Sequence, residues 1–351
     1  MPRWLKLLLV VIVPLIVAAL AWVDAPLYQA PIVEATRVTN QKAEAITDEN
    51  QNQDHQTNQE IRARYLNTKR KGQTVSLNNT FTDSGTIDFE VKTGNQLFVT
   101  SGKSPQIKDL KRDWLLLSLL SLFIVVLALT MRRQFWMTLI SLVLNTGLFY
   151  LAVHVDVTNQ QLSVGLLFSG LAIAFTLITA VFIVGLKPLA GVISGVTVLA
   201  TGLAVALGYA IMTLTNYAGI HLETVKYVTQ APQLLFYIQV VIGALGAVLD
   251  IVGDISMTLA ASPQTGKARF QTGMALGRDI LGPLINVLLM IFMVGTFSEA
   301  ILWLRNSNSI AQTVEWVMGL GLAQTLISAF GIVLAVPITS LLMSMRRGTT
   351  R

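Results

Sequence analysis

The sequence predicts an α-helical polytopic membrane protein of about eight transmembrane helices that carries a small β-rich extracytoplasmic domain. Hydrophobic residues make up 53% of the 351 residues and charged residues only 13%, whereas soluble domains are about 25% charged. A helix of about 20 apolar residues crosses a bilayer core about 30 Å thick, and charge-free runs of roughly that length recur along the chain. A polar stretch, residues 24–112, follows the first run.

Each apolar run is predicted to be a helix, because a backbone in lipid must satisfy its hydrogen bonds internally. The expected spans, in chain order, are Trp4–Val23, Trp114–Met131, Phe135–Val153, Ser163–Gly185, Leu189–Leu214, Leu234–Asp254, Pro283–Leu304 and Trp316–Met343. The spans after the polar stretch form one membrane domain, residues 113–345, and residues 346–351 form a basic tail. The short link at residues 186–188 predicts that the two helices it joins are antiparallel neighbours.

The first span, within residues 1–23, fits either a cleaved signal peptide or a retained anchor helix. Basic residues precede its apolar stretch, and Ala19-Leu20-Ala21 fits a signal-peptidase site. Trp22 and Val23 extend the apolar run beyond that site, which favours the anchor. Both alternatives place residue 24 and those after it outside the cytoplasm.

Residues 24–112 are expected to form a separate extracytoplasmic domain. Residues 48–54 are all acidic or amide residues and predict an unstructured loop. Polar and apolar residues alternate in Thr74–Leu77, Ile87–Val91 and Gln96–Val99, which predicts short strands. Turn-forming residues separate these segments, so the pattern favours a small antiparallel β unit of the kind that forms partial barrels.

The net charge of +6 raises the question whether the partner is nucleic acid or membrane lipid, and the positions of the charges decide it. Outside the long polar stretch, the basic residues fall at the ends of spans that would be cytoplasmic if the N-terminus is cytoplasmic: Arg3, Lys6, Arg132, Arg133, Lys187, Lys267, Arg269, Arg278, Arg346, Arg347 and Arg351. Only Lys226 and Arg305 fall on the other side. This positive-inside bias predicts that both termini are cytoplasmic, that the bilayer is the partner, and that nucleic acid is not.

Charged residues inside spans are the first candidates for function, because an acid at mid-span costs about 2.5–3.5 kcal/mol. Asp250 and Asp254 lie in the sixth span, and Arg278 and Asp279 lie just before the seventh. By helical periodicity, one face of the sixth span is small and polar, comprising Gln239, Gly243, Gly246, Asp250, Gly253 and Asp254. The opposite face, Val240, Ala244, Val248, Ile251 and Ile255, is apolar and is expected to face lipid.

The seventh span carries a second polar face, formed by Asp279, Pro283, Asn286 and Met290. We expect the two faces to approach each other and form a candidate polar or ion site of Gln239, Asp250, Asp254, Asp279 and Asn286, with Arg278 as its charge partner. Asp254 and Asp279 are expected near the cytoplasmic surface. A competing interpretation is a hydrated salt bridge of Arg278 with Asp250 or Asp254 that fixes two helix ends.

No enzyme activity is predicted. The sequence contains no phosphate-binding Gly-rich loop, no His-Glu-x-x-His and no Gly-x-Ser-x-Gly elbow. Two membrane aspartates could share a proton and cleave peptides, but neither Asp250 nor Asp279 has the context of an intramembrane aspartyl protease. No cofactor is predicted, a metal site stays undetermined, and the absence of cysteine excludes disulfides and thiolate chemistry.

Glycines predict where helices pack closely. Gly191 and Gly195 have the small-xxx-small spacing that favours helix association, and the full set of expected packing glycines is Gly191, Gly195, Gly243, Gly246, Gly277 and Gly282. Self-association, or association with a related membrane protein, is expected along the first two. Residues 266–282, with Lys267 and Arg269, fit either an amphipathic segment on the inner leaflet or a plain cytoplasmic loop.

Two motifs resemble a known family. Residues 243–250 (GALGAVLD) and 273–282 (GMALGRDILG) resemble the signature of the YibE/F-like membrane proteins, and residues 71–78 and 92–95 resemble that family's strand and turn pattern. Pro283 departs from it, because a small or hydroxylated residue is usual there. The resemblance implies a bacterial multipass protein of the cell membrane with an extracytoplasmic N-terminal domain, often encoded beside a paralogous partner. It implies no activity.

Two functions follow as hypotheses from the residues. The first is a transporter or permease for a small solute or ion, for which Asp250→Asn should abolish flux in a folded protein. The alternative is a non-transporting membrane scaffold or sensor whose outer domain binds a partner. If the charges only hold helices together, Asp250→Asn should reduce stability, and neutralising Arg278 as well should partly restore it.

Overall fold

The computed structural model describes residues 2–47, 51–85, 88–102, 104–131, 134–159, 163–224 and 232–346. Several residues used in the topology and strand predictions lie outside the described residues, namely residues 48–50, Ile87, Arg132, Arg133, Lys226, Arg347 and Arg351. The chain divides into two units, Met1–Phe135 and Trp136–Arg351, and each is described by itself.

Eight helices of the described chain are long and apolar enough to cross a membrane, which confirms the predicted number. They are α1 (Arg3–Val23), α2 (Asp113–Met131), α3 (Phe135–Thr158), α4 (Val164–Val184), α5 (Pro188–Leu214), α6 (Pro232–Ala261), α7 (Gly266–Arg305) and a last span that joins α8 (Ile310–Thr313), a π-helical turn η4 (Val314–Met318) and α9 (Gly319–Met345). Most start and end within a few residues of the predicted bounds.

The sixth and seventh spans differ from their predicted bounds. Helix α6 continues past Asp254 to Ala261, and α7 begins at Gly266 and passes through Pro283 without a break. Residues 266–282 are therefore the first part of α7, so the prediction of a plain loop is wrong, whereas the amphipathic segment on the inner leaflet stays a prediction. The predicted spans were limited to charge-free runs, whereas α6 and α7 continue as helix through the charged residues near those limits.

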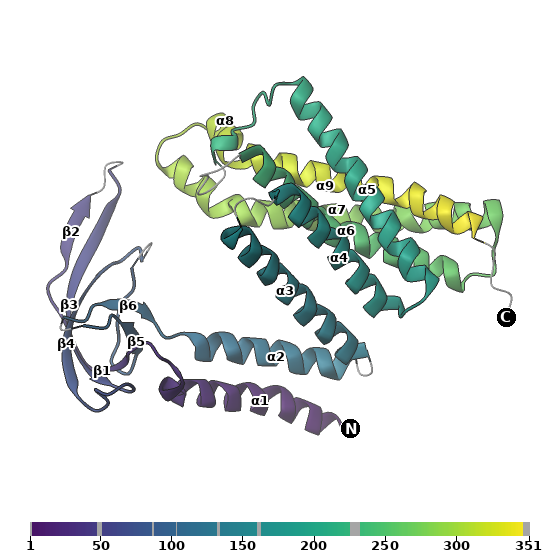
Figure 1. Ribbon diagram of the computed structural model, residues 1–351. Helices are drawn as coiled ribbons and strands as arrows, with labels where there is room; N and C mark the ends of the chain where they lie inside the picture. The colour runs from purple at the N-terminus through teal and green to yellow at the C-terminus, as the bar shows by residue number, and fades with distance from the viewer. Residues whose placement is uncertain are drawn as a thin grey trace. The chain divides into compact units, whose positions relative to one another are not determined.

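The first unit contains α1, α2 and a β domain, which we define as residues 25–112 (Figure 1). Helices α1 and α2 lie side by side, and the β domain joins the C-terminal end of α1 and the N-terminal end of α2. Its strands are β1 (Ile32–Asn40), β2 (Glu44–Thr47), β3 (Gln53–Tyr65), β4 (Thr74–Thr82), β5 (Gln96–Val99) and β6 (Ile107–Leu110). They form an antiparallel sheet in the order β2-β3-β1-β5-β6, with β4 also paired to β3.

Two of the three predicted strands are confirmed in this sheet, and the third is wrong. The predictions at Thr74–Leu77 and Gln96–Val99 are confirmed by β4 and β5. Residues 88–91 form no strand, so that prediction is wrong; the buried amide of Gln59 holds this segment instead, donating to the Val91 carbonyl at 3.0 Å and accepting from the Val91 amide at 2.9 Å. Residues 53 and 54, predicted as loop, are the start of β3.

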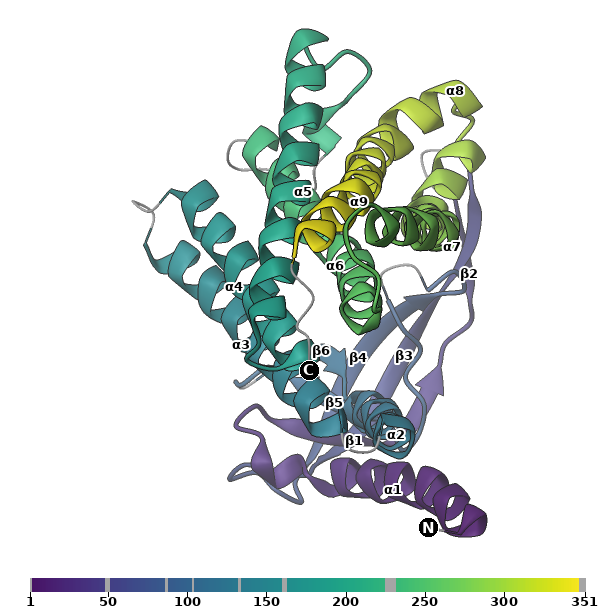
Figure 2. The same ribbon diagram turned by 90° about the vertical axis from the view of Figure 1, so that its right-hand side faces the viewer.

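In the second unit, α9 packs against α5, α6 and α7 (Figure 2). The core is made of apolar side chains of α5, α6 and α9, such as Ile193, Val248 and Ile332, all 0% exposed. Gly273 and Gly277 of α7 lie directly against Ser340 and Val336 of α9, where a Cβ atom would clash. The close approach of α7 to α9 therefore depends on glycine at both positions.

Candidate functional site

The polar face of α6, defined as Gln239, Gly243, Gly246, Asp250, Gly253 and Asp254, lies on the outside of the second unit. All of these residues except Gly253 are exposed. The opposite face, Val240, Ala244, Val248, Ile251 and Ile255, is 0% exposed throughout. The prediction that this apolar face contacts lipid is wrong: it packs into the protein core, because apolar side chains suit either environment and the pattern cannot distinguish them.

The acids of α6 have no basic partner in the described chain. Asp250 and Asp254 lie one helical turn apart, and the ion pairs among the described residues all involve other carboxylates. Arg278 is exposed and forms no ion pair with either acid. The described residues therefore do not contain the salt bridge that would fix α6 to α7.

The polar face of α7 is exposed as well, since Asp279, Pro283, Asn286 and Met290 all lie on its open side. Pro283 has no N–H, so the carbonyl of Asp279 lacks its helical donor. Asp279 thus offers an exposed carboxylate on α7 and a backbone carbonyl that lacks its usual donor four residues later. The buried residues of α7, Arg269, Gly273 and Gly277, face the other way.

The acids lie well inside their helices rather than at the helix ends. Between Asp250 and the last residue of α6, Ala261, the helical rise is about 16 Å. Between the first residue of α7, Gly266, and Asp279 it is about 20 Å. The predicted end of the sixth span at Asp254 is wrong, because α6 extends to Ala261. The position of Asp254 and Asp279 near the cytoplasmic surface stays a prediction.

Gln324 of α9 is a polar neighbour of this face that the sequence analysis missed. Its amide nitrogen approaches the backbone carbonyl of Gln239 at 3.4 Å, and it would lie 3.3 Å from a Cβ placed on Gly243. A glutamine inside an apolar span was the available signal. The structure thus joins Gln239, Gly243 and Gln324 at one end of the polar face.

The remaining predicted packing glycines differ in their surroundings. Gly277 lies against Val336, as described above, whereas a Cβ placed on Gly191, Gly195, Gly246 or Gly282 would meet nothing within 4 Å. A Cβ at either glycine of the small-xxx-small pair of α5 would therefore stand in open space. Gly246 and Gly282 leave open space on the exposed faces of α6 and α7.

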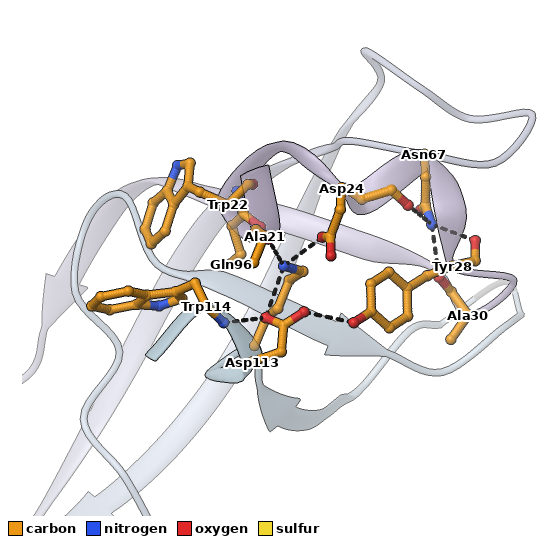
Figure 3. A network of polar contacts seen from close by, with 11 residues as sticks. Ala21, Trp22, Asp24, Tyr28, Ala30, Asn67, Gln96, Asp113 and Trp114 are labelled. Carbon is orange, nitrogen blue, oxygen red and sulfur yellow. Dashed lines mark hydrogen bonds and ion pairs between the residues drawn. The ribbon is translucent and has the colours of Figure 1, made fainter. Parts of the chain in front are cut away.

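A second polar cluster lies where the β domain joins α1 and α2 (Figure 3). The side chain of Lys111 is 0% exposed, and its Nζ lies 2.8 Å from Asp24 Oδ1 and 2.8 Å from Asp113 Oδ1. The same Nζ donates to the carbonyl of Ala21 in the last turn of α1. Tyr28 donates its hydroxyl to Asp113 Oδ2 at 2.6 Å, and this bond, together with burial, raises the pKa of Tyr28 to about 12.

Two buried amides extend this cluster into the sheet. The Asn67 side chain donates to the carbonyls of Ala25, Tyr28 and Ala30 at 3.0, 3.0 and 2.8 Å (Figure 3). Gln96 of β5 donates to the carbonyl of Trp22 at 2.9 Å, and the Trp22 ring meets the Trp114 ring edge-on at 5.7 Å. The end of α1 and the start of α2 are thus bonded to the β domain.

The sequence analysis did not predict this junction cluster, which we define as Asp24, Tyr28, Asn67, Gln96, Lys111 and Asp113. Its signal was charge placed at both margins of the polar stretch, with Asp24 after the first span and Lys111 and Asp113 before the second. The topology prediction counted only basic residues outside the polar stretch and assigned no role to these three. Asp24, Lys111 and Asp113 form a buried ion triad, which holds the ends of α1 and α2 against the β domain. We assign it a structural role.

A third cluster joins the loop after α5 to the start of the last span. The His221 ring lies between Glu223 at 3.0 Å and Glu315 at 3.3 Å and stacks on Trp316 with centroids 3.7 Å apart. Hydrogen bonds to Glu223 and then Glu315 raise the pKa of His221. Its two nitrogens point at different carboxylates, and no group of three or more His, Asp or Glu residues in the described chain could hold a metal ion.

Long apolar helices joined to a small strand domain, with acids on exposed helix faces, define a multipass membrane protein by length and composition. The chain belongs to the YibE/F-like family. The family model described as YibE/F-like protein matches residues 119–348, and the model described as YibE/F family N-terminal domain matches residues 26–110. The resemblance found in the sequence is thereby confirmed. Comparisons with curated proteins and with solved structures gave no match.

Proposed function

We propose that this protein moves a small cation, or protons, across the cell membrane along the polar face of α6, with both termini in the cytoplasm and the β domain outside. The observation that carries the proposal is the position of Asp250 and Asp254. Both are exposed, lie opposite the core face of α6, and have no basic partner among the described residues.

These acids are costly within a bilayer. Two acids within a membrane helix cost together about 5–7 kcal/mol on insertion scales, which is comparable to the whole stability of a typical domain. A structural ion pair would offset that cost, but Arg278 does not supply one within the described chain. Carboxylates kept in a span without a structural partner are best explained by binding of a mobile cation.

Polar groups near the α6 acids are also suited to binding a cation. Oxygen ligands suit hard cations, and α7 offers the Asp279 carboxylate and the Asn286 amide on its own exposed face. Gln239 and Gln324 add polar groups at the other end of the α6 face. In this proposal Arg278 limits the net negative charge of the path.

The junction cluster favours a second candidate, a membrane sensor or scaffold. Bonds from Lys111, Asn67 and Gln96 connect the β domain to the ends of α1 and α2, so a partner bound to the β domain could move this helix pair as one body. In both candidates the protein is not an enzyme, needs no cofactor and binds no nucleic acid.

The test is flux through purified protein in proteoliposomes under gradients of protons and of monovalent and divalent cations. Wild type is compared with Asp250→Asn and with Asp156→Asn, a matched acid-to-amide change on α3. The proposal expects wild-type flux, its loss in a folded Asp250→Asn protein, and its retention in Asp156→Asn. Absence of flux under every gradient, or equal flux in all three proteins, would reject it and leave the sensor.

A further inference from the structure

We propose that a second copy of this chain covers the polar face of α6, with Arg278 of each copy paired to Asp250 and Asp254 of the other. The proposal stands on the exposed charges alone and does not require that ions are transported. If cations are transported, they compete with Arg278 of the second copy for the two carboxylates. It assigns an interface to the faces of α6 and α7 that the described chain leaves open.

The first step is that these faces cannot remain against lipid. Asp250, Asp254, Arg278 and Asp279 are exposed on α6 and α7, and each lies at least seven residues from the nearer end of its helix. Charged residues within membrane spans face a protein interior or a water-filled cavity, and pair with one another. Within the second unit, the described residues give these charges no ion-pair partner and no cover, and a second copy of the chain offers both.

The second step is charge complementarity within one sequence. The open faces carry acids on α6 and a guanidinium on α7, so a single chain holds both halves of the pair. Such a surface suits an isologous dimer, in which residue i of one copy meets residue j of the other and the reverse. A surface that binds an unrelated protein does not require both charges of each pair in one chain.

The third step is that the two halves lie at the same level. Asp250 is about 16 Å of helix from the end of α6 at Ala261, and Arg278 is about 18 Å from the start of α7 at Gly266. Residues 262–265 join these two ends directly. A two-fold axis along the membrane normal keeps every residue at its own depth, so it brings Arg278 of one copy to Asp250 of its partner.

Small residues permit the contact. Gly246 on α6 and Gly282 on α7 each have open space where a Cβ would stand, and they lie about 22 and 24 Å from the same helix ends. Glycines on facing helices allow backbones to approach closely in membranes. The expected dimer therefore places Gly246 of one copy close to Gly282 of the other.

The absence of native cysteine makes this contact directly testable. One tagged copy carries Gly246→Cys and a differently tagged copy carries Gly282→Cys, and both are expressed together in membranes and oxidised. The matched control replaces Gly246→Cys by Gly202→Cys, an exposed glycine with open space on α5. We expect a mixed disulfide with Gly246→Cys and none with Gly202→Cys.

A charge variant separates pairing from simple proximity. Arg278→Asp should reduce the cross-linked fraction by about tenfold or more, because it leaves dehydrated carboxylates unpaired, whereas Arg278→Lys should retain it. The proposal is overturned if Gly246→Cys cross-links no better than the control, or if the purified wild-type protein is a monomer by single-molecule photobleaching. Loss of flux in Asp250→Asn without any cross-link would overturn the dimer and leave the proposed function intact.

Discussion

Removal of the buried Lys111 charge should destabilise the β domain strongly. The Lys111 side chain is 0% exposed, and those of Asp24 and Asp113 are 17% and 22% exposed. Removing one partner of a buried ion pair costs about 3–5 kcal/mol of stability. We use the lower value of this range because the two carboxylates keep some contact with water. Lys111→Met should therefore reduce the free energy of unfolding of the β domain by about 3 kcal/mol.

The assay is hydrogen–deuterium exchange of the central strand β1, followed in the full-length protein. A loss of about 3 kcal/mol corresponds to exchange faster by roughly 150-fold. The matched control is the triple variant Lys111→Met, Asp24→Asn, Asp113→Asn, in which no charge is left unpaired, and its exchange should return most of the way to wild type. Acceleration below about fivefold, or a triple variant as fast as the single one, would refute the reasoning.

Two further variants test the second unit. Gly277→Ala should cost about 1–3 kcal/mol of stability, because the new Cβ would clash with Val336. Gly202→Ala, at an exposed position with open space on α5, should leave thermal stability unchanged or higher, and equal melting of both variants would contradict the packing. Because the pKa of His221 is raised above its ordinary 6.5, its stabilising contribution should be complete below pH 6.5 and decline as pH rises through the folded-state pKa. His221→Gln should flatten this part of the thermal stability profile, and an unchanged profile would show that the ring does not titrate against Glu223.

The helical part of the fold could be predicted because a span is a contiguous property of the chain: about 20 apolar residues are visible without knowledge of their neighbours. The sheet was harder. Strand β3 turns Thr57, Gln59, Ile61, Ala63 and Tyr65 inward, so two of its five inward positions are polar. The alternation that marks a strand was hidden, because the buried Gln59 amide is satisfied by a segment far away in sequence.

The sequence predicts which residues share the polar face of α6, but not whether the opposite face contacts lipid or the protein core. Helical periodicity identifies which residues share a face of α6, since it depends only on spacing. It does not tell whether Val248 and Ile251 face lipid or the helices α5 and α9, because both surroundings are apolar. The junction cluster escaped prediction for a different reason: Asp24, Asn67 and Lys111 meet only after the sheet has formed.

The central claim is that water and cations reach the polar face of α6 inside the membrane, and thiol accessibility tests it most directly. In the naturally cysteine-free chain, Gln239→Cys places a thiol at an exposed position of that face, away from the proposed contact at Gly246, and Gly202→Cys places one on α5. We predict that a charged, membrane-impermeant thiol reagent modifies Gln239→Cys rapidly, that added cations slow this reaction, and that Gly202→Cys stays unreactive. Equal inertness of both thiols would show a dry face and contradict the account.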